Sequence, residues 1–492
     1  MKKRSWPWIF LCLLFFFQGQ MLTRPDAREK ISPGLWRALH SVSESGATLP
    51  VWVYLQDKGE TDIASMKKAF AEARRTLREH CLWRRSKVRP AAGLIDYEDL
   101  PLYVPYTQQV KASALKVRAV SRWLNAVSVE ASPEQVLELT GLACVKSVDI
   151  VKSFKRDDGS AGTPEETQIA AGPSNPLYGL SYTQLGQINV PALHQQGLSG
   201  RGVLVCMLDV GFRKSHEAFR LAHRLAEWDF VNGDGDVSQR LSDPNDYSDD
   251  HGTATWSLLG GFKLGELIGP AFGADFILGK TETSNYEKPI EEDWWAAGIE
   301  WAESLGAEVV SSSLGYTDWY QFKDMDGKTA VTTRAANRAA SLGVVVVNAA
   351  GNERGNAWGH IIAPADGYDV IAAGAVDSSG KIASFSSPGP TYDGRTKPEV
   401  CALGVSDWVA ANRQDQSDYY TRGSGTSFAT PLVAGVAALL LEAHRDWTPK
   451  QVRAALMNTA GSASSPNNDY GWGIVNAAAA VNYAPALPQR QQ

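Results

Sequence analysis

The sequence has 492 residues, of which 44% are hydrophobic and 21% charged, a balance typical of a soluble globular protein with two or three domains. The net charge is −6, but residues 22–152 hold 20 Lys and Arg against 15 Asp and Glu, so the rest of the chain is acidic. An acidic body argues against nucleic acid as the main partner. The five cysteines form neither a zinc-binding pattern nor a dense disulfide framework, so we expect buried free thiols.

The N-terminus has the pattern of an export signal. Lys2, Lys3 and Arg4 precede an apolar run over residues 6–17, and polar residues follow it. This run is too short to span a bilayer comfortably, and no second run approaches that length. We expect residues 1–21 to be a signal peptide and the protein to be secreted or otherwise extracytoplasmic, with no membrane partner beyond this segment. Because no clear cleavage site follows, an uncleaved anchor is the alternative.

Residues 22–152 are predicted to form a small α+β domain. Its predicted elements are a strand over 48–56, a helix over 62–81, a strand over 121–132, a helix over 133–141 and a strand over 143–151. Ser132 and Pro133 are a typical start for the second helix. Residues 153–176 are predicted to be a linker, because Gly, Ser, Pro and charged residues dominate there, and such a linker is a natural place for a proteolytic cut.

Residues 177–484 alternate between strands and helices and precede a short tail, residues 485–492. The predicted strands are largely apolar and cover residues 201–209, 274–280, 308–314, 343–350 and 369–376. The predicted helices cover residues 291–306, 328–343, 427–444 and 449–460. This pattern predicts an α/β fold, a doubly wound, mostly parallel sheet with helices on both faces. Sites in such sheets lie beyond the carboxyl ends of the strands.

Four polar residues stand at strand ends or helix starts, namely Asp209, His251, Asn352 and Ser427. Each has a simple structural alternative: a turn-starting Asp, an exposed loop His, a turn Asn and a helix-capping Ser. Together, however, an acid, an imidazole and a hydroxyl form a set that activates a nucleophile. The hydroxyl needs a base, the base needs an anion to fix its tautomer, and the developing oxyanion needs donors. Asn352 and the backbone N–H of Ser427 are candidate donors.

Seven segments resemble motifs of the subtilisin family (subtilases) of serine peptidases, in the family's order. They are VCMLDVGF around Asp209, DDHGTATW around His251, SSSLGY at 311–316, AAGNE around Asn352, FSSPGPTYDGRTKPEV at 385–400, GTSFATPLVAGVAALL around Ser427 and YGWGIVNAAAAV at 470–481. The resemblance covers about residues 177–480. It implies a subtilisin-like fold and a serine endopeptidase that acts on polypeptides.

The resemblance also implies a role for each matching residue. Ser427 would attack the scissile carbonyl, His251 would move the proton and Asp209 would orient the imidazole. The Asn352 amide and the Ser427 N–H would hold the oxyanion. Substrate-binding residues would come from two segments that face each other and pair with an extended peptide, namely Ser313, Leu314 and Gly315, and Ala350 and Gly351.

Three residues near the motifs depart from the family's pattern. Val210 stands where a hydroxyl residue is usual, Ala254 where a second histidine is usual, and Phe428 where Met is often found. None of these changes removes a reacting group, so they concern hydrogen bonding around the site and its pH optimum. The chemistry requires no cofactor. Structural calcium is common in the family, but it is assigned to no residue here, because the loop at 232–243 lacks the glycine of a calcium loop.

The first domain resembles an inhibitory propeptide of this family over about residues 110–152. The resemblance implies that the domain assists folding and blocks the cleft until the linker is cut, so the enzyme would be a zymogen whose partner is its own propeptide. The opposite charges of the two parts fit such an association.

Two other functions compete with a peptidase. The first is a catalytically silent protein of subtilase fold that binds peptides. The second is an esterase of the α/β-hydrolase type, which is disfavoured because GTSFA around Ser427 lacks the second glycine of G-x-S-x-G and the order Asp–His–Ser differs. A phosphate-binding loop before Lys280 is also disfavoured, because Ala274 occupies the position of its first glycine.

Overall fold

The computed structural model describes residues 28–41, 47–59, 62–151, 175–238, 248–283, 290–317, 319–411 and 417–484. The contacts within the chain divide it into two compact units. The smaller unit is Met1–Arg75 with Ile95–Ser153, and the larger unit is Thr76–Leu94 with Phe154–Gln492. The predicted signal peptide, most of the predicted linker and the predicted tail lie outside the described residues.

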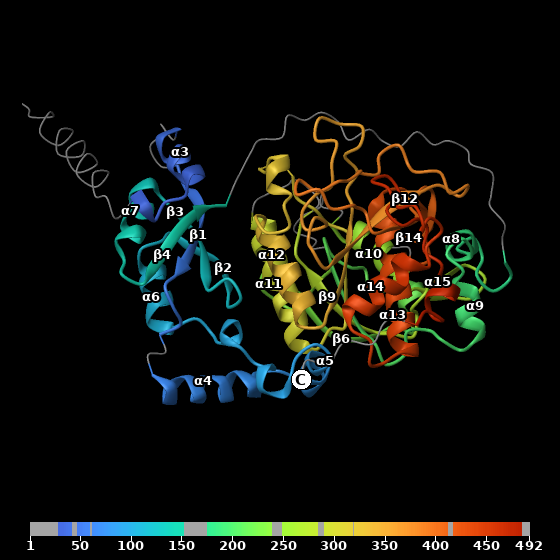
Figure 1. Ribbon diagram of the computed structural model, residues 1–492, viewed down its shortest axis with the longest axis horizontal. Coiled ribbons are helices and arrows are strands. Elements are labelled where there is room, and N and C mark those ends of the chain that lie inside the picture. Colours follow the sequence, from blue (N-terminus) through green and yellow to red (C-terminus); the bar gives the residue numbers. More distant parts are fainter. Residues whose placement is uncertain are drawn as a thin grey trace, which may run out of the picture. The chain divides into compact units, whose positions relative to one another are not determined.

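The smaller unit contains a four-stranded antiparallel sheet with strand order β2-β3-β1-β4 (Figure 1). Its strands are β1 (Leu49–Leu55), β2 (Lys116–Ser121), β3 (Ala126–Ala131) and β4 (Val145–Ile150). Its helices are α3 (Pro33–Ser41), α4 (Ile63–Thr76), α6 (Val104–Ala112) and α7 (Pro133–Gly141). As predicted, Ser132 caps α7: its hydroxyl accepts the N–H of Gln135, and Gln135 bonds back to the N–H of Ser132.

Two predicted elements in this region have different bounds in the structure. The helix predicted over 62–81 is two helices, α4 and α5 (Glu79–Ser86), because Arg78 between them is extended (φ −67°, ψ 150°). The strand predicted over 121–132 begins with a turn, in which Asn125 has a φ of 48°, and only then continues as β3. That turn joins β3 to β2, a short strand in which polar and apolar residues alternate only from Lys116 to Ala119 and five of the six residues are exposed or half-exposed.

The larger unit is built on a seven-stranded sheet with strand order β13-β12-β11-β10-β5-β9-β6, in which every neighbouring pair is parallel. The strands are β5 (Leu204–Asp209), β6 (His223–Asp229), β9 (Asp275–Lys280), β10 (Val309–Ser312), β11 (Val345–Ala349), β12 (Val370–Val376) and β13 (Val400–Leu403). All residues of β5, β11 and β12 are buried, as expected for strands covered on both faces. The predicted fold class is therefore confirmed.

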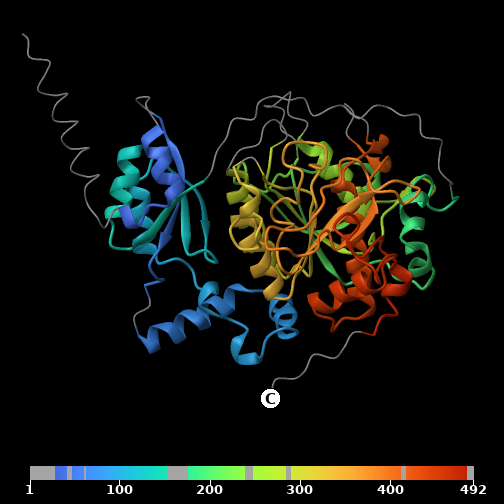
Figure 2. The same ribbon diagram turned by 45° about the horizontal axis from the view of Figure 1, so that its top comes forward.

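The predicted helices of this unit form α11 (Ile290–Leu305), α12 (Val331–Ser341), α13 (Thr426–Ala443) and α14 (Pro449–Asn458). A further helix, α10 (Ser248–Gly260), packs against α13, while α11 packs against α12 (Figure 2). Among the described residues, α13 alone is long and apolar enough to cross a membrane. It is 83% buried in the unit, which is the burial expected of a core helix.

The strand order places a crevice at the carboxyl end of β5. From β5, the strands later in the chain run to one side as β10, β11, β12 and β13, and β9 lies on the other side. Connections leave a parallel sheet in opposite directions at such a point, and a ligand crevice opens there. Asp209, the last residue of β5, therefore lies where the sheet favours a site.

Candidate active site

Asp209 is held rigidly at the end of β5 and is fully buried. Its Oδ1 accepts hydrogen bonds from His251 Nδ1 at 2.7 Å and from the backbone N–H of Val210 at 2.8 Å. Its Oδ2 accepts from the hydroxyl of Thr255 at 2.9 Å. These donors fix the plane of the carboxylate and satisfy both of its oxygens, as a buried charge requires.

His251 lies near the start of α10, and its side chain is 34% exposed. Burial lowers the pKa of His251, but the charge of Asp209 and its hydrogen bond outweigh burial, so the pKa is raised above its ordinary value. The next residue, Gly252, is required by packing, because a Cβ there would lie 2.0 Å from the carbonyl oxygen of Gly211. The close approach of α10 to the end of β5 therefore depends on this glycine.

Ser427 is the second residue of α13, and the helix has no side-chain cap. The N-cap residue is Gly425, with a φ of 152°, so Ser427 does not play the capping role that its position also suggested. The Ser427 hydroxyl donates to the carbonyl oxygen of Ser313 at 3.1 Å, and no hydrogen bond joins it to His251 within the described residues. The backbone N–H of Ser427 lies in the first turn, where amides lack partners inside the helix and favour negative charge.

Asn352 is oriented by the residue before Ser427. Its side-chain oxygen accepts from the backbone N–H of Thr426 at 2.9 Å and from the Thr426 hydroxyl at 3.0 Å. Because both bonds use the oxygen, the amide NH₂ group is left to face the pocket that Asn352 lines. This amide and the Ser427 N–H are therefore the two candidate donors at the pocket.

The predicted substrate-binding residues follow β10 and β11, which are neighbours in the sheet. Ser313, Leu314, Gly315 and Gly351 line the same pocket as His251, Asn352 and Ser427. Gly351 has a φ of 107°, and a Cβ there would lie 2.8 Å from Ile362. Ala350, in contrast, is fully buried in a core cluster, and its neighbour Ala349 lines the pocket instead. Residues alternate in direction along an extended chain, so adjacent alanines point to opposite sides.

The pocket has a volume of about 340 Å³, and its lining includes residues that lie outside the predicted catalytic and substrate-binding sets. Glu282 and Thr283 follow β9, and Glu353 follows Asn352. Their position just after a strand was the available signal, but no motif drew attention to them. Two carboxylates in the lining give the pocket an acidic character.

The three residues that depart from the family's pattern, Val210, Ala254 and Phe428, lie in or near the pocket. Val210 lines it, Ala254 is buried in α10, and the Phe428 ring lies edge-on to His251 with ring centroids 6.1 Å apart. Among the described residues, no three His, Cys, Asp or Glu side chains gather as a metal site would require. The expectations about cofactors and calcium stay predictions.

Comparison with known proteins assigns this chain to a family. A sequence model of the subtilase family matches residues 200–473, and a model of the peptidase S8 propeptide domain of Bacteroidota matches residues 50–167. The chain belongs to the subtilase family, and it is a subtilisin-like serine endopeptidase that carries a propeptide.

Individual relatives agree with this assignment. Subtilisin amylosacchariticus from Bacillus subtilis subsp. amylosacchariticus is 34% identical over 339 residues, which cover 67% of this chain and 78% of that protein. Subtilisin from Bacillus pumilus is 35% identical over 312 residues, which cover 62% of this chain and 98% of that protein.

A solved structure extends the likeness in fold to most of the chain. The crystal structure of fervidolysin from Fervidobacterium pennivorans, a keratinolytic enzyme related to subtilisin, matches with a TM-score of 0.59 and 20% identity. The match covers 91% of this chain and 62% of that one, and at this identity it shows the fold alone.

Proposed function

We propose that this chain is made as an exported zymogen and hydrolyses peptide bonds through Asp209, His251 and Ser427. The observation that carries the proposal is the 2.7 Å hydrogen bond from His251 Nδ1 to the buried Asp209, at the edge of the pocket that also holds Ser427. This bond assigns the proton to Nδ1 and leaves Nε2 as the basic nitrogen. A neutral imidazole held in this way is suited to accept the proton of a hydroxyl.

The reaction follows from these roles. The Ser427 oxygen attacks the scissile carbonyl carbon, His251 Nε2 takes the hydroxyl proton, and the negative oxygen is received by the Asn352 amide and the Ser427 N–H. The C–N bond then breaks, and the proton moves from His251 to the leaving amine. Water repeats the sequence on the acyl-enzyme and releases the acid product. Asp209 stays ionised and stabilises the imidazolium in both stages.

The resting hydrogen bond of the Ser427 hydroxyl must break for this chemistry. It points to the Ser313 carbonyl, so we expect a rotation about the Cα–Cβ bond of Ser427 when substrate binds. Catalytic hydrogen bonds in the absence of substrate are often long or misdirected, and they tighten in the substrate complex.

Maturation and location complete the proposal. The residues matched by the propeptide model end within the predicted linker, so a cut there would separate the two parts of the zymogen. The basic and apolar N-terminus supports export, as does the similarity to subtilisins. Polypeptides are the expected substrates, and the propeptide is the expected partner.

The proposal is tested by expressing the natural sequence and the Ser427→Ala variant side by side. We expect the natural chain to shorten by about the length of the N-terminal region and to digest casein, and we expect Ser427→Ala to do neither. Ser464→Ala, at an exposed serine, is the matched control and should behave like the natural sequence. If Ser427→Ala shortens and digests casein equally, the assignment of the nucleophile is wrong.

The competing function is a silent peptide-binding protein, and the resting direction of the Ser427 hydroxyl is the observation that favours it. A fluorophosphonate reagent distinguishes the two, because it labels a serine only when a base activates it. We expect the label on Ser427 of the natural protein, located by peptide mapping. Binding of casein peptides without any labelling would support the silent protein.

A further inference from the structure

A short stretch of the propeptide region belongs to the peptidase unit. The propeptide model matches residues 50–167, yet Thr76–Leu94 groups with the larger unit by its contacts. Within that unit, α5 packs against α11, and both views show it beside the ends of α11 and α12 (Figure 1 and Figure 2). The propeptide region is therefore not one compact body that can leave as a whole.

Two arginines of α5 are buried completely against one carboxylate of α11. Arg84, Arg85 and Glu303 are each 0% exposed. Arg85 donates two parallel hydrogen bonds of 2.8 Å to the Glu303 carboxylate, from Nε to Oε1 and from Nη2 to Oε2. Arg84 Nη2 also donates to Oε1. Paired, planar contacts of this kind are the strong form of ion pair, and removing the partners of a buried charge is costly.

Arg84 also satisfies backbone groups of the peptidase unit. Its guanidinium donates to the carbonyl oxygens of Ala307 at 2.6 Å and of Glu303 and Leu342 at 3.2 Å. Ala307 follows α11 and Leu342 follows α12, so one side chain joins the ends of both helices. Without Arg84, these carbonyls would lose donors that they have in a buried place.

A second buried carboxylate of the peptidase unit is also shared with the segment. Glu308, whose side chain is 1% exposed, bonds to His80 at 3.1 Å, to Lys87 at 3.3 Å and to Arg445 at 2.9 Å. Burial raises the pKa of Glu308, but these three partners outweigh burial and bring the pKa below its ordinary value. Without the segment, Glu308 would keep Arg445 and lose His80 and Lys87.

The backbone of the peptidase unit is shaped for this helix. Gly306 and Gly343 follow α11 and α12 with positive φ angles of 102° and 95°. A Cβ on Gly306 would lie 3.0 Å from the His80 ring, and a Cβ on Gly343 would lie 3.0 Å from the Arg84 carbonyl oxygen. Glycine is common at helix ends, but here both glycines also make room for α5.

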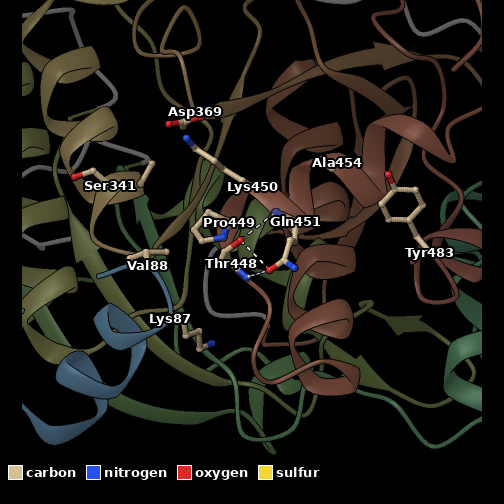
Figure 3. Close-up of a pocket in the computed structure, with 11 residues that line it drawn as sticks. Lys87, Val88, Ser341, Asp369, Thr448, Pro449, Lys450, Gln451, Ala454 and Tyr483 are labelled. Atoms are coloured by element: carbon tan, nitrogen blue, oxygen red, sulfur yellow. Dashed lines mark hydrogen bonds between the residues drawn. The ribbon is translucent and has the colours of Figure 1, made fainter. Parts of the chain in front are cut away.

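Beyond α5 the packing opens, although Lys87 still bonds to Glu308 and Arg89 donates to the carbonyl oxygen of Ser341 at 3.4 Å. The residues that follow, Lys87 and Val88, form one wall of a cavity of about 640 Å³, opposite Pro449 and Lys450 of α14 (Figure 3). The tight contacts are thus concentrated between His80 and Lys87, and this part of the segment is the anchor.

We infer that residues 76–94 remain bound to the peptidase unit after the chain is cut in the predicted linker, as a short piece of propeptide that the mature enzyme keeps. The inference rests on the proposed function in assuming that the linker is cut, but the retention itself requires no activity. Cutting the linker alone leaves the smaller unit joined to both ends of the anchored segment, at Arg75 and at Ile95. A tethered unit stays at a high local concentration, so its release requires further cuts on both sides of the segment.

Trypsin provides the first test, because Arg84 and Arg85 are themselves its cleavage sites. Ser427→Ala protein, which should not cut itself, is digested under native conditions and its fragments are identified by mass. We expect cleavage after Arg84 and Arg85 to be at least about tenfold slower than after the exposed Arg74 and Arg75 of α4, because a protease cuts buried bonds only when they open. Equal rates at both helices would overturn the inference.

Variants show whether the contact with Glu303, rather than the intrinsic stability of α5, protects Arg84 from trypsin. Glu303→Gln keeps the shape but removes the charge, and cleavage after Arg84 should become fast. Arg85→Gln weakens the same contact from the side of α5 and leaves residues 177–484 unchanged, so it tests the contact if Glu303→Gln fails to fold. Glu72→Gln, at an exposed residue of α4, is the matched control and should change nothing. Protection of Arg84 that persists in both anchor variants would contradict the role of Glu303.

Size-exclusion chromatography of the digest gives the second readout. We expect a fragment that contains Cys81 to Arg85 to elute with the peptidase fragment in native buffer and to separate from it in denaturant. Elution of that fragment by itself in native buffer would overturn the inference. The two failures are distinguishable: loss of retention leaves the peptidase activity standing, and an active Ser427→Ala protein would overturn the proposed function without affecting retention.

Discussion

At the scale of single residues, the pKa of His251 depends mainly on Asp209. Burial lowers this pKa, and the charge and hydrogen bond of Asp209 are the main influences that raise it, so the pKa should fall if Asp209 is replaced by a neutral residue. For Asp209→Asn we expect kcat to fall about 10⁴-fold, a cost known for Ser–His–Asp triads, because the imidazole loses its correct tautomer. The acid limb of kcat/KM against pH should also move to lower pH, since that limb reports the pKa of the base.

Asp250 provides the control for this prediction. It also raises the pKa of His251 by its charge, but it does not hold the imidazole. Asp250→Asn should therefore shift the acid limb slightly to lower pH while kcat stays close to that of the natural enzyme. If Asp209→Asn keeps its acid limb at the original pH, then Asp209 does not control the base.

The proposed oxyanion donor, Asn352, gives a second prediction at the scale of single residues. Replacing Asn352 with Ala removes a donor that is needed as the carbonyl oxygen becomes negative, so kcat should fall about 10²- to 10³-fold with little change in KM. Steady-state kinetics on a peptide substrate measure both constants. Asn482→Ala removes an exposed amide outside the pocket and should leave kcat unchanged. A rise in KM with an unchanged kcat would instead indicate a role in substrate binding.

At the scale of elements, local signals predicted the strands and helices that bury an apolar face. The runs around β5, β9, β10, β11 and β12 were largely apolar, which is the pattern of central parallel strands. The edge strand β6 carries charged and half-exposed residues, so it lacked that signal. The break before α5 was also not visible, because no Gly or Pro marks it and contacts far along the chain decide it.

The start of α11 offers a prediction about pH and stability. Glu292 is buried there and accepts hydrogen bonds from Trp319 at 2.7 Å and Tyr320 at 2.9 Å. Burial raises the pKa of Glu292 to about 7 from 4.5, although these donors lower it. The folded protein therefore holds this proton more tightly than the unfolded chain does. Its contribution to stability is complete below pH 4.5 and is lost as the pH rises through 7.

This dependence can be measured in the Ser427→Ala background, where self-digestion should not interfere. The contribution of Glu292 to the free energy of unfolding should fall by about 3 kcal/mol between pH 4.5 and pH 7, as the shift in its pKa requires. Glu292→Gln stays neutral and can still accept both hydrogen bonds, so denaturant titrations should show a much smaller fall. Asp446→Asn, at an exposed carboxylate, should keep the original dependence. An unchanged fall in Glu292→Gln would show that another group is responsible.

At the scale of the whole molecule, the motifs named residues that the fold brings together, whereas no motif marked the bounds of the two units. Asp209, His251, Asn352 and Ser427 are far apart in the sequence. In the structure, however, His251, Asn352 and Ser427 line one pocket, and Asp209 at the end of β5 bonds to His251. The units could not be predicted in the same way. Residues 76–94 have the composition of the domain around them, and contacts with residues far along the chain, such as Glu303 and Glu308, assign them to the larger unit.

Because the cysteines are divided between the two units, the number of thiols that can be titrated reports which parts of the chain are present. The structure shows Cys81, Cys144, Cys206 and Cys401 as free and buried, as predicted. Burial raises the pKa of each thiol, to about 12 for Cys81 and Cys401, so native protein should react slowly with Ellman's reagent. With Cys12 lost in the predicted signal peptide, denatured Ser427→Ala protein should then titrate all four.

Mature enzyme should give a different count. Cys144 lies in the smaller unit and Cys81 in the anchored segment. Once the smaller unit has been degraded, native chromatography followed by denaturation should recover three thiols, from Cys81, Cys206 and Cys401, whereas loss of the whole propeptide would leave two. Reducing agent should not change the unfolding temperature, because these four thiols form no disulfide. A count of two in fully active enzyme would show that the peptidase unit tolerates its buried carboxylates without the arginines of α5.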